Sequence, residues 1–319
     1  MEKLVSILTP CYNGEKYIWR LLDSILHQTY PRIEMFVIDD GSTDNSAKLI
    51  KSYISKFEKK GYFLRYIYQE NCGASGAINA GLQYIDGEYL VWPDADDWYN
   101  SDTAIADLVE VFENSSENVG LVRGLQYLRN EKTLKIIGKN GDENKIYPKK
   151  LFKQCMFGDG DWWYTPGGNM VKTKHFFYYY PNKKIYSDYR WQNIQLQFPI
   201  LFDYDCITIN KYIYNTLVNF NSDSRKQVSY VVKIKREEGL RNMCISVLDI
   251  MKNMSLAEKE KYKCAIQDRY NENLFYIFLF HKKYKDAQSI FFKVNLNSKK
   301  KIFTKFIKIL IKKLLNFIR

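Results

Sequence analysis

The chain has 319 residues, a hydrophobic fraction of 46% and a formal net charge of +12. This length allows a core of the largest single-domain size or two smaller units, and the apolar content excludes a disordered chain. The six cysteines are scattered without a Cys-x-x-Cys pair, which excludes the signature of a zinc ribbon or a disulfide framework and is typical of reduced thiols.

The first hundred residues alternate between predicted strands and helices. The strands are expected at residues 4–8, 33–38, 63–68 and 89–92, and the helices at about 15–28, after 42 and from 75. Ile18, Leu22 and Ile25 recur at helical spacing in the first helix, and Ser42 or Thr43 can cap the second. Strands separated by helices predict right-handed crossovers, a parallel sheet and an α/β fold.

Polar residues follow each of these four strands, at residues 9–13, 39–42, 69–71 and 94–97. Ligands of an open parallel sheet bind beyond the carboxyl ends of its strands, so the four clusters predict one binding edge. Asp94, Asp96 and Asp97 place three carboxylates after a buried strand, where they need a positive partner. A hard divalent cation carrying phosphate is the expected partner, and a plain acidic surface turn is the alternative.

The pattern loosens after Asp97. One more helix is marked by Ile105, Leu108 and Phe112, and strands are expected at 119–127 and 133–137. The region that follows is rich in aromatic residues up to about 220, and 225–290 is predicted to be helical. We divide the chain into two halves of one α/β domain, a helical region and a tail, with the bounds 1–100, 101–220, 221–298 and 299–319.

Residues 299–319 carry eight basic residues and no acid, so this tail holds most of the net charge. Its lysines line one side of a predicted helix, at Lys301, Lys305, Lys308 and Lys312, and apolar residues line the other. Such a helix favours attachment to an anionic membrane surface, with packing on the body or on a partner as the alternative. No recognition motif for nucleic acid accompanies the charge.

No run approaches the roughly 18 apolar residues of a spanning helix, and no signal peptide is visible after Met1. We therefore expect a cytoplasmic protein held peripherally on the inner face of the cell membrane.

Several motifs of the first hundred residues together resemble glycosyltransferase family 2. They are residues 5–13 (VSILTPCYN), 24–30 (SILHQTY), 37–44 (VIDDGSTD), and the stretch from Asn71-x-Gly73 to Asp94-Ala95-Asp96-Asp97. The resemblance implies the GT-A fold, a Rossmann-like, mostly parallel sheet flanked by helices, here followed by a helical C-terminal region. It also implies inverting transfer of a sugar from a nucleotide donor, usually a UDP-sugar.

Residue roles follow from the resemblance by position. The residues expected to bind the nucleotide-sugar are Pro10, Tyr12, Asn13, Asp40, Asn71 and Asp94. Asp40 matches the carboxylate that accepts a hydrogen bond from the base. Asp94 lies near the ribose and the metal, and Asp96 is the direct ligand of Mn²⁺ or Mg²⁺. Asp97 is expected to cap a helix, or else to support the metal ligands.

The reaction needs a base, and the resemblance places it in an acidic pair before a helix. Asp188 stands at that position, with Ser187 in place of the usual Glu, and a role as helix N-cap is the alternative. Asp159 and Asp161 are the next candidates. Two neighbouring residues, Trp162 and Trp163, are expected either to stack on a sugar or to belong to the core.

Two further positions carry expectations. The family commonly has an arginine where this chain has Ile78, ahead of Asn79 and Gly81, so this chain lacks a cation that could hold phosphate there. For Gly81 we expect a role in helix packing. His175 is expected at the surface, with a place in the metal shell as the alternative.

The sequence therefore predicts a metal-dependent inverting glycosyltransferase of bacterial surface polysaccharide synthesis, acting on a glycan or a lipid-linked acceptor. Two alternatives come from other classes. A non-catalytic nucleotide-sugar or carbohydrate-binding module would typically lose Asp96 or the base. A nucleotidyltransferase would need a Gly-rich, basic phosphate loop after the first strand, and residues 9–13 lack one.

Overall fold

The structure, a computed structural model, describes residues 2–158, 160–188, 191–219 and 228–295, together with residues 299, 300 and 304. The chain divides into two compact units, Met1–Lys226 and Gln227–Arg319. The division of the first unit at residue 100 stays a prediction. The predicted amphipathic tail lies outside the described residues except at those last three positions.

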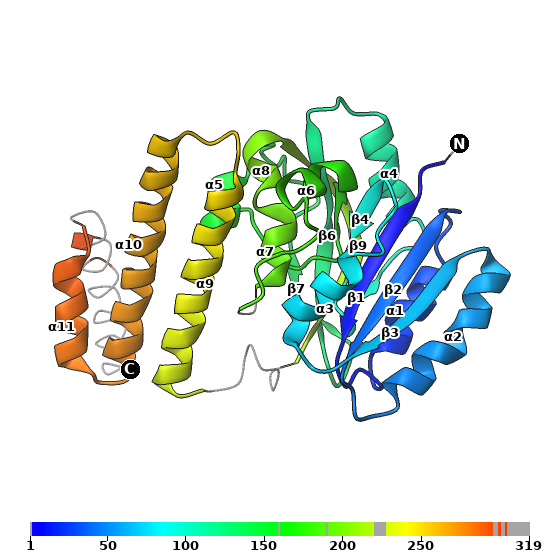
Figure 1. Cartoon of the computed structure of the whole chain (residues 1–319), viewed down its shortest axis with the longest axis horizontal. Coiled ribbons are helices and arrows are strands. Elements are labelled where there is room, and N and C mark those ends of the chain that lie inside the picture. The colour runs from blue at the N-terminus through cyan, green and yellow to red at the C-terminus, as the bar shows by residue number, and fades with distance from the viewer. Residues whose placement is uncertain are drawn as a thin grey trace. The chain divides into compact units, whose positions relative to one another are not determined.

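The described part of the first unit contains one sheet. Its strands are β1 (Val5–Cys11), β2 (Ile33–Asp40), β3 (Phe63–Gln69), β4 (Tyr89–Val91), β5 (Trp98–Tyr99), β6 (Val119–Asn130), β7 (Ile136–Asn140), β8 (Asn169–Lys172) and β9 (Asp205–Val218). The strand order is β3-β2-β1-β4-β8-β6-β9-β5, and β7 pairs with β6 (Figure 1).

The first four strands of this order are parallel to one another. Val5 of β1 pairs with Ile33 on one side and with Tyr89 on the other, so β1 is a central strand. Antiparallel pairing begins where β8 joins β4, and β6 and β9 pair in parallel beyond it. The predicted α/β fold with a mostly parallel sheet is confirmed. All four strand ends that carry the predicted polar clusters open onto the same edge.

Helices cover both faces of the sheet in the first unit. They are α1 (Ile18–Leu26), α2 (Ser46–Lys60), α3 (Gly73–Leu82), α4 (Ala104–Glu113), α5 (Phe152–Phe157), α6 (Thr173–Tyr179), α7 (Gln192–Gln197) and α8 (Ile200–Asp203). Helices α1, α2 and α4 share one buried cluster with Val5 and Ile7 of β1. Alternation along the strand turns Leu8 to the opposite face, where α3 packs. A Cβ on Gly81 would lie 2.0 Å from the Leu8 Cδ1, which confirms that Gly81 is a packing residue.

Local details differ from the sequence expectations at two places. Helix α2 begins at Ser46 without a side-chain cap, because Ser42 instead accepts a hydrogen bond from the Asn13 amide. The strand expected at 133–137 begins later, at Ile136. Asn130 accepts hydrogen bonds from the amides of Lys132 and Thr133, and this turn occupies the residues that were expected to start the strand.

The second unit is helical where it is described, as expected. It contains α9 (Tyr230–Ile250), α10 (Leu256–Phe280) and α11 (Tyr284–Lys293). Ser255 and Glu258 form a capping box that satisfies the first amides of α10. None of the helices in the described ranges combines the length and the apolar character needed to cross a bilayer.

Candidate active site

A cavity of about 300 Å³ lies at the carboxyl ends of β1, β2 and β4. It is lined by Pro10, Cys11, Tyr12, Asn13, Gly14, Tyr17, Asp40, Ala74, Asp94, Ala95 and Asp96. Six of the seven residues predicted to bind nucleotide-sugar or metal are among them. The seventh, Asn71, is exposed outside this lining and donates a hydrogen bond to the Asp40 carbonyl oxygen over 2.9 Å.

The turn between β1 and α1 forms one wall of the cavity. Asn13 bonds this turn to the loop between β2 and α2. Its backbone φ is +50°, in the left-handed region that asparagine tolerates. The Asn13 Oδ1 accepts from the Thr43 amide at 2.8 Å, and the Asn13 amide donates to the Ser42 hydroxyl at 2.9 Å. Next to it, the Tyr12 side chain is 56% exposed at the mouth of the cavity. The turn therefore has a backbone held by hydrogen bonds and an exposed aromatic ring beside the cavity.

The Asp40 carboxylate closes the β2 side of the cavity and is almost fully buried. Its Oδ1 accepts from the Gln69 Nε2 at 2.6 Å and from the Cys72 amide at 2.9 Å. Among the described residues no donor is recorded for its Oδ2. A buried carboxylate oxygen in a cavity wall is suited to accept a hydrogen bond from a ligand N–H.

Asp94 and Asp96 close the β4 side, and both are partly buried. Removal from water, and then the negative charge of Asp96, raise the pKa of Asp94 to about 7. The Asn193 amide nitrogen of α7 lies 3.4 Å from the Asp94 Oδ2 and opposes this rise. The two carboxylates therefore repel each other in a shared, poorly solvated position.

Asp188 lies exposed on the segment between α6 and α7. The Tyr186 phenol donates a hydrogen bond to it, and burial together with that carboxylate raises the pKa of Tyr186. The N-cap of α7 is Trp191, so the alternative of Asp188 as helix cap is wrong. Its role as base stays a prediction.

The family model for glycosyl transferase family 2 matches residues 6–166, which is half of the chain. The chain belongs to glycosyltransferase family 2. It is 30% identical over 191 residues to the glycosyltransferase GlyA of Streptococcus pneumoniae, a match that covers 50% of this chain and 26% of GlyA. It is 39% identical over 98 residues to GlyG of the same organism, covering 30% of this chain and 31% of GlyG. The matched part is thus under a third of the length of either relative.

Two solved structures share the fold of this family 2 chain. Staphylococcus aureus TarS 1–349 in complex with UDP-GlcNAc superposes with a TM-score of 0.58 at 16% identity, over 86% of this chain and 79% of that one. The mannosyltransferase PcManGT from Pyrobaculum calidifontis, in complex with GDP-Man and Mn²⁺, gives a TM-score of 0.58 at 16% identity, over 99% and 83%. At this identity the likeness establishes the fold alone.

The family implies a divalent cation, and the donor set at Asp94 and Asp96 fits one. A cation would relieve the repulsion that raises the pKa of Asp94. The described residues contain no group of three or more Asp, Glu, His or Cys side chains placed to hold an ion. Magnesium-type sites need no such group, because one or two carboxylates, waters and substrate phosphates complete the shell.

Asp97, the third carboxylate of the motif, has a structural role. It is 2% exposed, and its Oδ1 accepts from the Leu217 amide of β9 at 2.8 Å. The expected role as helix cap is therefore wrong, because the β4 loop folds back against β9 instead. This bond ties the metal motif to the far part of the sheet.

Tyr17 lines the cavity and was missed by the sequence analysis. Its hydroxyl donates to the Glu131 carboxylate, and this bond is the main cause that raises the pKa of Tyr17 to about 12. The partner lies more than a hundred residues away at the end of β6, so no local pattern announces the pair. Only the position of Tyr17, four residues after the first polar cluster, could have suggested it.

The two tryptophans pack around Arg123 of β6. Trp162 and Trp163 are each 8% exposed, and the Arg123 guanidinium carbon lies 3.8 Å from the centre of the Trp163 ring. This packing favours the core role, and contact with a sugar stays a prediction. The Asp161 carboxylate is ion-paired with Lys145, while Asp159 lies outside the described residues.

His175 corrects a further expectation. It is 6% exposed and stacks on Tyr204 with ring centres 3.9 Å apart, so it is not a surface residue. It lies in α6, whose first residue, Thr173, bonds to Glu88 at the amino end of β4. Asp96 follows the carboxyl end of the same strand. His175 therefore lies at the opposite edge of the sheet and does not join the metal ligands.

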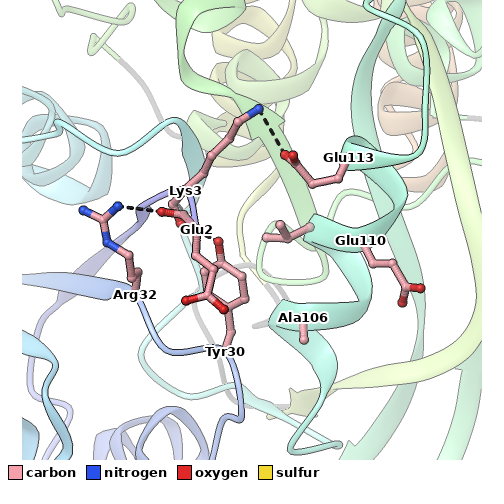
Figure 2. A pocket seen from close by; sticks show the side chains of 8 residues that line it. Glu2, Lys3, Tyr30, Arg32, Ala106, Glu110 and Glu113 are labelled. Carbon is pink, nitrogen blue, oxygen red and sulfur yellow. Dashed lines mark hydrogen bonds and ion pairs between the residues drawn. The ribbon is translucent and has the colours of Figure 1, made fainter.

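A larger hollow of about 830 Å³ also lies at the amino edge of the sheet, between the start of β1 and α4 (Figure 2). Several of its polar groups already bond to other groups of the lining. Lys3 pairs with Glu113 at 3.1 Å, Arg32 donates to the Glu2 carbonyl, and the Tyr30 hydroxyl donates to the Lys3 carbonyl. We therefore assign the candidate active site to the smaller cavity.

Proposed function

We propose that this chain is a metal-dependent inverting glycosyltransferase that moves a sugar from a nucleotide donor to a hydroxyl group of a glycan or lipid-linked acceptor. One observation carries the proposal: Asp40, at the end of β2, lines the same cavity as Asp94 and Asp96, which follow β4. The donor is expected to be a UDP-sugar. The complexes of TarS with UDP-GlcNAc and of PcManGT with GDP-Man support the nucleotide-sugar class.

The proposed reaction uses Asp188 as the base and Asp94 with Asp96 as the ligands of a cation. The acceptor oxygen attacks the anomeric carbon, and the bond from that carbon to the diphosphate oxygen breaks with its electron pair. Attack from the face opposite the diphosphate inverts the configuration. The hydroxyl proton moves to the Asp188 carboxylate, which is exposed and able to receive an acceptor. Asp94 and Asp96 would hold a divalent cation that, when bound, offsets the charge growing on the diphosphate.

The nucleotide end of the donor is assigned to the β1 and β2 side of the cavity. Asp40 Oδ2 would accept from the base, and the open Tyr12 ring would lie against it. Both residues sit on walls that are fixed by short hydrogen bonds before any ligand arrives. Prior fixation reduces the conformational entropy lost on binding.

Placement at a membrane and a part in surface polysaccharide synthesis stay predictions from the sequence alone. They rest on the basic tail, residues 299–319, which lies almost wholly outside the described residues. A lipid-linked acceptor would be reached from such a surface.

The experiment is a screen of UDP-, GDP- and dTDP-sugars for release of the nucleotide diphosphate, with manganese or magnesium and with chelator. We expect release from one donor class with metal, and loss of that release in Asp96→Ala. Asp188→Ala should lose transfer and still bind UDP. UDP binding without turnover of any donor would favour the non-catalytic binding module, and equal turnover in chelator would refute the metal role of Asp96.

A further inference from the structure

The segment that carries Asp188 has no strand beside it. Residues 184–187 belong to neither a helix nor a strand, although Ile185 is only 4% exposed. Buried backbone amides and carbonyls need partners, and an unpaired extended segment would leave them unsatisfied. Side-chain amides supply the hydrogen-bond partners that a neighbouring strand would otherwise provide.

Asn79 of α3 supplies the first pair of bonds. The Ile185 amide donates to the Asn79 Oδ1 at 2.8 Å, and the Asn79 Nδ2 donates to the Ile185 carbonyl at 3.1 Å. One turn later on α3, Gln83 donates to the Lys183 carbonyl at 3.0 Å. Residues four apart lie on the same helix face, so α3 holds this segment along one side.

Gln195 of α7 supplies a matching pair. The Tyr186 amide donates to the Gln195 Oε1 at 2.8 Å, and the Gln195 Nε2 donates to the Tyr186 carbonyl at 2.9 Å. The Gln195 side chain is fully buried. The backbone of Ile185 is therefore bonded to α3, and the backbone of Tyr186 is bonded to α7. Helices α3 and α7 lie next to each other in Figure 1.

The same short helix also reaches the metal motif. Asn193, two residues before Gln195, lies 3.4 Å from the Asp94 Oδ2. The backbone that leads to Asp188 is thus held by α7, and α7 also contacts Asp94, one of the two carboxylates assigned to the cation. The hydrogen bond from Tyr186 to Asp188 extends the same chain of contacts to the proposed base.

We propose that Asn79 and Gln195 are positioning residues, which fix the backbone of Ile185 and Tyr186 between α3 and α7 and so direct Asp188 toward the reacting hydroxyl. This inference rests on the proposed function. Asn79 follows Ile78, the position where the family commonly has an arginine. The inference gives Asn79 a role that does not involve phosphate. Both carboxamides are bonded to the backbone of the segment and act through it, so they are positioning residues and not catalytic residues.

The test compares Asn79→Ala and Gln195→Ala with Gln28→Ala. Gln28 is a matched control, because its carboxamide is also bonded to backbone, at Ser24, Ser101 and Ile105, and it is fully buried as Gln195 is. Hydrogen exchange followed by mass spectrometry should show at least about tenfold faster exchange at Ile185 and Tyr186 in the two test variants alone. Donor turnover should fall in them by about tenfold to a hundredfold in kcat, with UDP affinity unchanged within about twofold.

Unchanged exchange at both residues would overturn the proposal, and so would faster exchange with wild-type kcat. An equal loss of kcat in Gln28→Ala would show a general effect of destabilisation and would also overturn it. A wild-type protein that turns over no donor would refute the proposed function and with it the catalytic part of the inference. The exchange rates would still decide whether the two carboxamides fix the segment.

Discussion

His175 is expected to make the stability of the protein depend on pH. Burial lowers the pKa of His175 from 6.5 to about 4, and the positive charges of Lys172 and Lys174 add to this effect, while Glu117 opposes it weakly. The neutral ring stacks on Tyr204, and its Nδ1 is buried without a hydrogen-bond partner among the described residues. The folded state therefore disfavours the imidazolium form.

The sign and size of the effect follow from proton linkage. Because the folded pKa is lower than the unfolded one, stability is complete above about pH 6.5 and falls as the pH decreases toward 4, since the unfolded chain binds the proton first. The shift of about 2.5 units corresponds to about 3 kcal/mol when complete. At about pH 5 the loss should be about 2 kcal/mol, because the unfolded histidine is then mostly protonated and the folded one is not.

His175→Phe isolates this contribution, because phenylalanine keeps an aromatic ring against Tyr204 and does not titrate. Chemical unfolding of the wild type should show about 2 kcal/mol more loss between about pH 7.5 and pH 5 than the variant does. The chain has three histidines, so NMR titration of their ring protons can assign the pKa of His175 directly. A pKa near 6.5 for this ring, or the same pH dependence in both proteins, would refute the reasoning.

Four further predictions concern the site, the fold and the tail. UDP should raise the melting temperature clearly more with manganese than with chelator, and Asp96→Ala should abolish that difference in a thermal shift assay. In Asp188→Asn, kcat should fall at least about a hundredfold while calorimetry finds UDP affinity unchanged; an active variant would remove Asp188 as the base. Gly81→Ala should cost about 1–3 kcal/mol of unfolding free energy in a urea titration, because the added methyl group would overlap Leu8. Removal of residues 299–319 should release the protein from anionic liposomes in a flotation assay, and undiminished binding would exclude the tail as the anchor.

Local sequence signals were sufficient for the first half of the fold. Alternating apolar strands and amphipathic helices predicted that β1 to β4 form a parallel sheet, and the polar residues after each strand predicted the edge where Asp40, Asp94 and Asp96 line one cavity. Each of these inferences depends on residues that are neighbours in sequence. The packing role of Gly81 was likewise predicted from local sequence, because a glycine inside a helix suggested a close contact.

The errors arose where the deciding partner is distant in sequence. Asp97 looked like a helix cap because the residues near it allow one, yet its partner is the Leu217 amide. His175 looked exposed beside Lys174, yet Tyr204 covers it.

The sequence alone determined the family, the α/β fold class and the residues that bring negative charge to one edge of the sheet. These features can be recognised from short motifs and from hydrophobic periodicity. Only the tertiary structure decided which of those residues meet. It buried Asp97 against β9 and placed Asn79 and Gln195 on either side of the segment before Asp188. The physical reason is that buried polar groups must find partners, and the chain supplies those partners from elements that no local pattern connects.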